Sequence, residues 1–169
     1  RRSSDLGIAQ SIKDLYWDVR PKPEFGTVEI RVCDTPLTIE KACALTAFAQ
    51  SLAAWLLRER PQLDTAAEAY VARYNKFQAC RFGLNATIAD PLTQTAHPLR
   101  TRLAGLLDTL TPDARALGCA HWLDQLRREF VPEQGDADWL RARRAALGNI
   151  NDVVREAGRR WLDVPADGN

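Results

Sequence analysis

The stretch Thr27-Val28-Glu29-Ile30-Arg31-Val32-Cys33 alternates between polar and apolar side chains and predicts a β-strand. Successive side chains of a strand project to opposite faces, so the three apolar residues would form one face, which we expect to be packed inside. Glu29 and Arg31 would share the other face. Because a buried, unpaired ion is costly, we expect this charged face to line a cleft filled by water or ligand. The alternative is a structural Glu–Arg ion pair on an exposed sheet face, and the alternation alone favours neither.

Another strand is predicted just before this one, over residues 16–20. The intervening residues 21–26, PKPEFG, contain two prolines and a glycine and predict a loop. A parallel return would need a much longer crossover, so this short connection favours an antiparallel hairpin. Asp18 and Arg20 would then face the same cleft as the charged pair of the second strand.

Most of the remaining sequence predicts helices. Residues 34–36, Asp-Thr-Pro, suit a helix start, because Asp or Thr can cap and proline fits the first helical position. That helix would run to about residue 59. A capping-box pattern at residues 65–68 opens a second helix that stops near Gly83. Further helices are predicted over residues 99–110, 112–130, 137–147 and 151–162.

Two polar segments interrupt this helical pattern. Residues 85–90 are ambiguous between a short extended segment and a loop, and residues 91–97 predict a polar loop. The expected fold class is α+β, with short antiparallel strands followed by a mostly helical region. We expect a single unit over residues 1–169, in which residues 1–35 form the hairpin and residues 36–163 are mainly helical.

Composition narrows the class of protein. The 169 residues are 46% hydrophobic, enough to bury the core of one globular domain. The 23 basic and 22 acidic residues leave a net charge of +1, so no global field attracts nucleic acid or an anionic membrane. Arginines crowd the last third, but interspersed acidic residues predict solvated helix faces in preference to a polyanion site. The longest apolar stretch, residues 42–57, is too short for a membrane span.

The cysteines and histidines carry no metal or disulfide pattern. The 4 cysteines lie far apart without a CxxC pair, and there are 2 histidines. Reduced thiols in a cytoplasmic protein are the simpler interpretation. No signal-peptide pattern leads the sequence. Because the sequence lacks methionine and begins at Arg1, we expect it to be a piece of a longer protein.

Three segments carry a family resemblance: SIKDLYWDVRP at residues 11–21, GTVEIRVCDTP at 26–36 and YNKFQACRFGL at 74–84. They resemble bacterial carboxylate–amine ligases of the glutamate–cysteine ligase type 2 group, the YbdK type. More distantly, the Glu-x-Arg-x-x-Asp pattern before an alanine-rich helix is similar to glutamine synthetases. The resemblance covers most of this chain, but only the C-terminal part of a protein roughly twice as long. The family's N-terminal half is absent here.

The resemblance implies a fragment of a glutamine synthetase-like catalytic domain with ATP-dependent ligase activity. In that reaction a carboxylate such as glutamate attacks the terminal phosphate of ATP. An amine, cysteine or another, then displaces phosphate from the acyl phosphate to give an amide. Phosphoryl transfer relies on metal ions and arginines that position the phosphate and neutralise its charge. ATP and Mg²⁺ are therefore the implied cofactors.

The residue types of the hairpin suit that chemistry. Glu29 is the metal candidate, because Mg²⁺ prefers carboxylate oxygens. Arg31 and Arg20 are the candidates for catalytic and cofactor-binding roles, since a guanidinium binds phosphate or carboxylate in a bidentate fashion. The alternative role for Arg20 is a salt bridge to Asp18 or Glu24.

Two residues of the second predicted helix are further candidates. Asn75 and Arg81 lie in the third matching segment and are assigned to cofactor binding. They could instead cap or brace the helix end before Gly83. One glutamate cannot hold a magnesium ion alone, so we expect the isolated chain to be inactive without the missing N-terminal half of the same protein.

A second account remains open. The chain could be a non-catalytic helical interaction or regulatory module that retains the family's strand motif. A monomer and a homo-oligomer both fit the sequence, and no nucleic-acid or membrane partner is expected. These residues do not identify the amine substrate.

Overall fold

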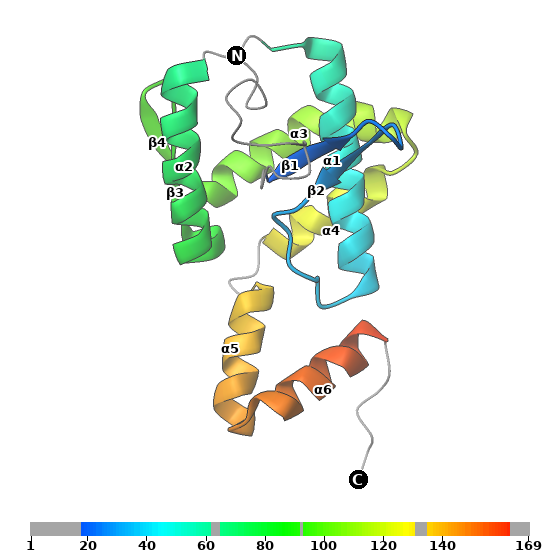
Figure 1. Ribbon diagram of the computed structural model, residues 1–169, viewed down its shortest axis with the longest axis vertical. Coiled ribbons are helices and arrows are strands. Elements are labelled where there is room, and N and C mark those ends of the chain that lie inside the picture. The colour runs from blue at the N-terminus through cyan, green and yellow to red at the C-terminus, as the bar shows by residue number, and fades with distance from the viewer. Residues whose placement is uncertain (1–17, 62–64, 92, 131–134, 163–169) are drawn as a thin grey trace. The chain divides into compact units, whose positions relative to one another are not determined.

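The computed structural model describes residues 18–61, 65–91, 93–130 and 135–162 (Figure 1). The chain forms two compact units, Arg1–Thr35 and Pro36–Asn169. Within the described ranges, the first unit contains a two-stranded sheet, and the second contains six α-helices and another two-stranded sheet. This mixture of short antiparallel strands and predominant helix confirms the expected α+β class.

The first unit is a hairpin of β1 (Val19–Lys22) and β2 (Thr27–Ile30). The two strands are antiparallel, with Arg20 directly opposite Glu29. Gly26 closes the turn with a φ of 62°, a left-handed conformation that glycine adopts without steric cost. The predicted antiparallel connection is therefore confirmed.

The predicted strand boundaries were wrong in two places. β1 continues through Pro21, which was expected to start the loop, and β2 ends at Ile30, three residues before the predicted end at Cys33. Proline fits β1 because each strand of a two-stranded sheet is an edge strand, where one side makes no ladder hydrogen bonds. Residues 16 and 17, the start of the predicted first strand, lie outside the described residues.

The second unit begins with α1 (Ile39–Glu59), whose N-cap is Thr38. The Thr38 hydroxyl accepts a hydrogen bond from the backbone N–H of Lys41 at 3.1 Å. The predicted start at residues 34–36 was therefore too early. The Leu37 backbone N–H donates to Asp136, 99 residues further along the chain, at 3.2 Å. The extended backbone at Thr38, with a φ of −143°, places the residues before it outside the helix, and this contact holds Leu37 there.

The core lies between α1, α3 (Leu99–Ala116) and α4 (Ala120–Phe130) (Figure 1). Each of these helices contributes small or branched apolar residues at helical spacing, so that their apolar faces interlock. The buried residues of this cluster are Ala44, Ala47, Leu107, Leu110, Ala114, Leu123 and Leu126.

A helix boundary was predicted between Leu110 and Pro112, but α3 runs through Pro112 to Ala116. Proline inside a helix removes one backbone donor and typically costs about 3 kcal/mol. Leu110 and Ala114, on either side of it, are both fully buried, and their packing holds the helix together. The break falls instead at Gly118, which has a φ of 72°. The next N–H, of Cys119, donates to the Ala114 carbonyl at 2.9 Å.

A second hairpin follows α2 (Thr65–Phe82) and the short 3₁₀ turn η3 (Gly83–Asn85). It consists of β3 (Thr87–Asp90) and β4 (Thr95–Pro98), paired antiparallel. The extended alternative for residues 85–90 is thus confirmed for β3. The loop predicted over residues 91–97 was wrong from Thr95 onward, where β4 begins, whereas Pro91, Thr93 and Gln94 form the turn between the two strands. Threonine has high strand propensity, and β4 contributes only four residues, too few for an alternation to be visible in the sequence.

The last two helices, α5 (Asp136–Leu147) and α6 (Ile150–Trp161), agree with the predicted helical segments. They are joined across a turn at Gly148, whose φ is 74°. Arg143 donates to Glu156 through two nitrogens, at 2.6 and 2.7 Å. No helix in the described part of the chain is both long enough and apolar enough to cross a bilayer. All 4 cysteines are free thiols.

Candidate functional site

The hairpin brings two of the predicted site residues together. Because Arg20 and Glu29 are cross-strand neighbours in the register, their side chains lie on the same face. The Glu29 Oε2 atom accepts from Arg20 Nε at 2.9 Å and lies 2.6 Å from Arg20 Nη2. Arg20 is buried, with 9% of the residue exposed, whereas 38% of the Glu29 side chain is exposed. The charged face therefore remains open to solvent at its carboxylate.

The ion pair with Arg20 lowers the pKa of Glu29. The hydrogen bond from Arg20 lowers the pKa of Glu29 below its ordinary value of 4.5, against a smaller opposing effect of partial burial. The charges of Arg20, Lys22 and Arg31 lower the pKa of Glu29 further. Three cations thus act on one carboxylate, and the charge around Glu29 is net positive.

A titration would test this arrangement. We expect the Glu29 carboxyl group, followed by carbon NMR, to titrate with a midpoint below 4.5. A depressed pKa stabilises the fold above the unfolded pKa, and that contribution is lost as pH falls through the folded pKa. Arg20→Gln should return the midpoint toward 4.5, whereas Arg115→Gln, in α3, should leave it unchanged. A wild-type midpoint at or above 4.5 would contradict the ion pair.

Arg31 lies just beyond the end of β2 and is exposed. Its backbone N–H donates to the Asp18 carbonyl at 2.7 Å, which continues the hairpin pairing by one more hydrogen bond. Arg31 follows Glu29 by two residues, and its charge contributes to the lowered pKa of Glu29. The first unit therefore gathers all three strongest candidates, Arg20, Glu29 and Arg31, at one end of the hairpin.

The opposite face of the hairpin differs from the expectation. The apolar residues Val28 and Ile30 were predicted to pack inside, but they are 63% and 46% exposed. The prediction of a strand from the alternation was correct, but the prediction that its apolar face is buried was wrong. Within the described part of the first unit, four-residue strands supply too little surface to bury an apolar face.

The magnesium assignment can be checked against the side chains present. Among residues 18–61, 65–91, 93–130 and 135–162, no three His, Cys, Asp or Glu side chains are grouped so that they could hold a metal ion. Mg²⁺ needs near-octahedral oxygen coordination, although it retains several waters. The described residues therefore do not form a complete metal site by themselves, and Glu29 is at most one ligand.

Asn75 and Arg81 belong to α2, in the second unit. The Asn75 side chain makes two hydrogen bonds to one residue of β3: Nδ2 donates to the Ala89 carbonyl at 2.8 Å, and the Ala89 N–H donates to Oδ1 at 2.7 Å. The amide thus pairs with Ala89 as a neighbouring strand would. This is a brace between α2 and the second hairpin, and it differs from the alternative considered for Asn75, a cap or brace of the helix end before Gly83. Arg81 lies exposed in the last turn of α2.

The brace makes a specific prediction for stability. Asn75→Ala should lower the free energy of unfolding of the chain by about 1–3 kcal/mol, because the Ala89 N–H and carbonyl both lose their partner. Arg73→Ala, two positions earlier on an exposed surface of α2, is the matched control and should change it far less. Urea denaturation followed by circular dichroism measures both. Equal stability of the two variants would contradict a bracing role.

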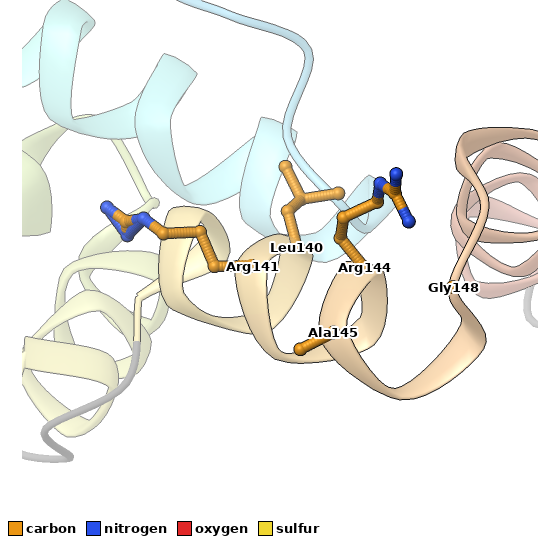
Figure 2. A pocket seen from close by; sticks show the side chains of 5 residues that line it. All are labelled: Leu140, Arg141, Arg144, Ala145 and Gly148. Carbon is orange, nitrogen blue, oxygen red and sulfur yellow. The ribbon is translucent and has the colours of Figure 1, made fainter.

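Two cavities contain polar residues that the sequence did not single out. One, of about 330 Å³, lies beside Val71 and Asp90, and the buried Asp90 carboxylate pairs with Arg102 at 3.0 Å. The other, of about 610 Å³, runs along α5 and is lined by Arg141 and Arg144. Figure 2 shows these two arginine side chains pointing in different directions, so their guanidinium groups do not converge on one ligand.

Comparison with known proteins places these features in a family context. Residues 1–156 match the family model described as glutamate-cysteine ligase family 2. A protein of Dechloromonas aromatica (strain RCB), named "Putative glutamate–cysteine ligase 2", is 66% identical over 156 residues, which are 92% of this chain and 41% of the relative. The identically named protein of Paracidovorax citrulli is 48% identical over 160 residues, 95% of this chain and 43% of the relative.

A third relative of the same name, from Janthinobacterium sp. (strain Marseille), is 44% identical over 162 residues, 95% of this chain and 44% of that protein. The chain therefore spans about two fifths of the length of the curated relatives it matches. The part of such a family-length protein that this chain does not span is called the family remainder below.

Proposed function

The chain belongs to glutamate–cysteine ligase family 2, and we propose that it supplies part of the active site of an ATP-dependent carboxylate–amine ligase. The observation that supports this most is the hairpin end, where Arg20 and Glu29 are paired and Arg31 adds its charge. A purely structural pair would not need the additional cations. An excess of guanidinium groups beside an open carboxylate suits a triphosphate and a carboxylate substrate.

The proposed reaction has two steps. A carboxylate oxygen of glutamate attacks the terminal phosphorus of ATP, the bond to the bridging oxygen breaks, and ADP leaves with the bonding electrons. The amine nitrogen, of cysteine or another amine, then attacks the acyl carbon of the acyl phosphate. Inorganic phosphate leaves, the nitrogen loses a proton, and an amide remains. Arg20 and Arg31 would neutralise charge on the transferred phosphoryl group and hold the substrate carboxylate.

Magnesium is the proposed cofactor beside ATP, and it would supply charge neutralisation of the phosphates. Arg20 contacts the Oε2 atom of Glu29 through Nε and Nη2, so Glu29 would bind a cation through Oε1. Further oxygen ligands would come from the family remainder, because the described residues do not complete the site. Asn75 and Arg81 stay proposed cofactor contacts of lower rank, since the Asn75 amide already pairs with Ala89.

The proposal carries consequences for partners and location. The chain would act together with the family remainder, and the 169-residue chain alone would be inactive. Its substrates would be small molecules, and the cytoplasm is the proposed location because ATP and reduced thiols are available there. Each of these statements concerns a family-length protein, since the chain spans about two fifths of its relatives.

The test uses a family-length chimera, defined as the Dechloromonas aromatica relative whose matching 156-residue segment is replaced by the corresponding part of this chain. With Mg²⁺, ATP and glutamate, we expect the chimera to release ADP and to form an amide when cysteine or another amine is added. The 169-residue chain alone should release none. A folded chimera that binds no ATP by calorimetry would refute the proposal.

The exposed apolar face of the hairpin favours a second candidate function. A non-catalytic interaction module would retain the strand motif and use surfaces such as that formed by Val28 and Ile30 for assembly. The same calorimetric measurement separates the two accounts, because an interaction module would form a stable assembly without binding ATP.

A further inference from the structure

Helix α2 exposes three large aromatic side chains on one side. Tyr70, Tyr74 and Phe77 are separated by four and three residues, so they lie on one line along the helix. Their exposed fractions are 78%, 45% and 61%. We call these three residues the aromatic stripe. A single exposed aromatic residue is common, but three in a row on one helix form a patch of the kind that marks an interaction surface.

The stripe is separate from the face that α2 uses within its own unit. Val71 lines a cavity together with Ala89, and Asn75 pairs with the Ala89 backbone. These contacts fix α2 against the second hairpin from a different side of the helix. Hence α2 contacts the second hairpin with one side, and the stripe occupies another side. Within the described residues, only one of those sides is used.

Charges accompany the stripe. Arg81 follows Phe77 by four residues and therefore continues the same line, and Arg73 lies beside it, one position before Tyr74. Both arginines are exposed. A surface that covers the stripe should therefore be apolar at its centre and carry carboxylates where it meets the two arginines.

We propose that the aromatic stripe is the docking surface for the family remainder. The chain spans 41% to 44% of its relatives, so a family-length protein brings a larger polypeptide to the same molecule. A surface that the rest of a protein covers is left bare when only part of the chain is present. The inference rests on the proposed pairing with the family remainder, but it concerns residues of α2 and none of the residues of the β1–β2 hairpin.

The size of the stripe argues against a second copy of this chain as the occupant. Three aromatic side chains of roughly 150–250 Å² each, only partly exposed, offer a few hundred Å². A stable interface between separate molecules typically buries about 800 Å² on each partner, because association must offset lost translational and rotational freedom. Packing within one family-length protein does not carry that cost, so a smaller patch suffices.

Hydroxyl-radical footprinting read by mass spectrometry tests the proposal. We expect Tyr70 and Phe77 to be oxidised several-fold more slowly in the family-length chimera than in the 169-residue chain. Two internal references come from α1: Phe48, which packs against the core, and Leu57, which is exposed. Both should be oxidised at the same rate in the two proteins.

A double variant adds a second readout. Tyr70→Ser with Phe77→Ser should lower the melting temperature of the chimera and leave that of the 169-residue chain unchanged, because only in the chimera are the side chains covered. The control substitution Leu57→Ser should change the melting temperature of neither protein to that extent. If the chimera does not fold, the intact Dechloromonas aromatica protein is footprinted over its segment matching residues 70–77, with the same expectation of protection.

Three outcomes would overturn the docking surface. Equal oxidation of the stripe in a folded family-length protein and in the chain alone would show that the family remainder lies elsewhere. Protection in the chain alone that grows with concentration and is lost in the double variant would assign the stripe to a second copy. Protection in the chain alone at every concentration would show that the stripe is not exposed. By contrast, a chimera in which the stripe is protected but which does not turn over ATP would contradict the ligase proposal. The docking surface would then still be supported.

Discussion

Glu29→Gln is expected to lower amide formation by the family-length chimera by a factor on the order of 10²–10³, the range found when one preorganised electrostatic contact is removed from an active site. Glutamine keeps the size of the side chain but has no charge. The variant would deprive a bound cation of an anionic ligand and leave the buried Arg20 guanidinium facing a neutral amide. Release of ADP at saturating glutamate and amine is the measurement.

The matched control lies in the same hairpin. Glu24 occupies the exposed turn between the two strands, so Glu24→Gln makes the same chemical change away from the paired arginine. Its turnover should stay close to that of the unaltered chimera. Full activity in Glu29→Gln, with a folded hairpin shown by NMR, would remove Glu29 from the catalytic site. Equal losses in both variants would point to the hairpin fold as the cause.

Leu110→Ala is expected to lower the free energy of unfolding of the second unit by about 2–5 kcal/mol. Leu110 has no exposed surface and lies in the cluster shared by α1, α3 and α4. Truncation would remove transfer free energy and leave a cavity. It would also weaken the packing that holds α3 together on the N-terminal side of Pro112. The measurement is equilibrium urea denaturation of the 169-residue chain followed by helical circular dichroism.

Leu57→Ala provides the comparison, because this α1 residue is of the same type and 75% exposed. A surface leucine loses little burial on truncation, so the change should stay within about 0.5 kcal/mol. If Leu110→Ala were as mild as Leu57→Ala, the packing of the three-helix core described above would be wrong.

Local patterns in the sequence were sufficient to predict the elements that are stabilised mainly by contacts between residues close in the sequence. The alternation around Glu29 and the short connection after Arg20 predicted an antiparallel hairpin, and that hairpin brings the two residues into contact. The helical segments that became α5 and α6 were likewise visible. The ion pair between Arg20 and Glu29 follows from the strand register. The alternation in the sequence already placed both residues on the same face of the hairpin.

Long-range packing decided the rest. The rule that proline ends a helix failed at Pro112, because buried residues on both sides stabilise α3 more than proline destabilises it. The start of α1 is capped locally by Thr38, but the residue before it, Leu37, is held by a hydrogen bond to Asp136, which no local window contains. β4, and with it the pairing of the second hairpin, was missed because the strand has only four residues, two of them polar. The apolar face of the first hairpin was expected to be buried, but strands of four residues offer too little surface to bury it.

The Asn75 brace has a consequence for the chemical ageing of the protein. Hydrolysis of its side-chain amide to a carboxylate would replace the nitrogen that donates to the Ala89 carbonyl by an acceptor oxygen. Two oxygens would then face one another where a 2.8 Å hydrogen bond now exists, while the second contact, from the Ala89 N–H, would survive. Deamidation of this one side chain during storage would therefore loosen the junction between α2 and β3 without breaking the chain.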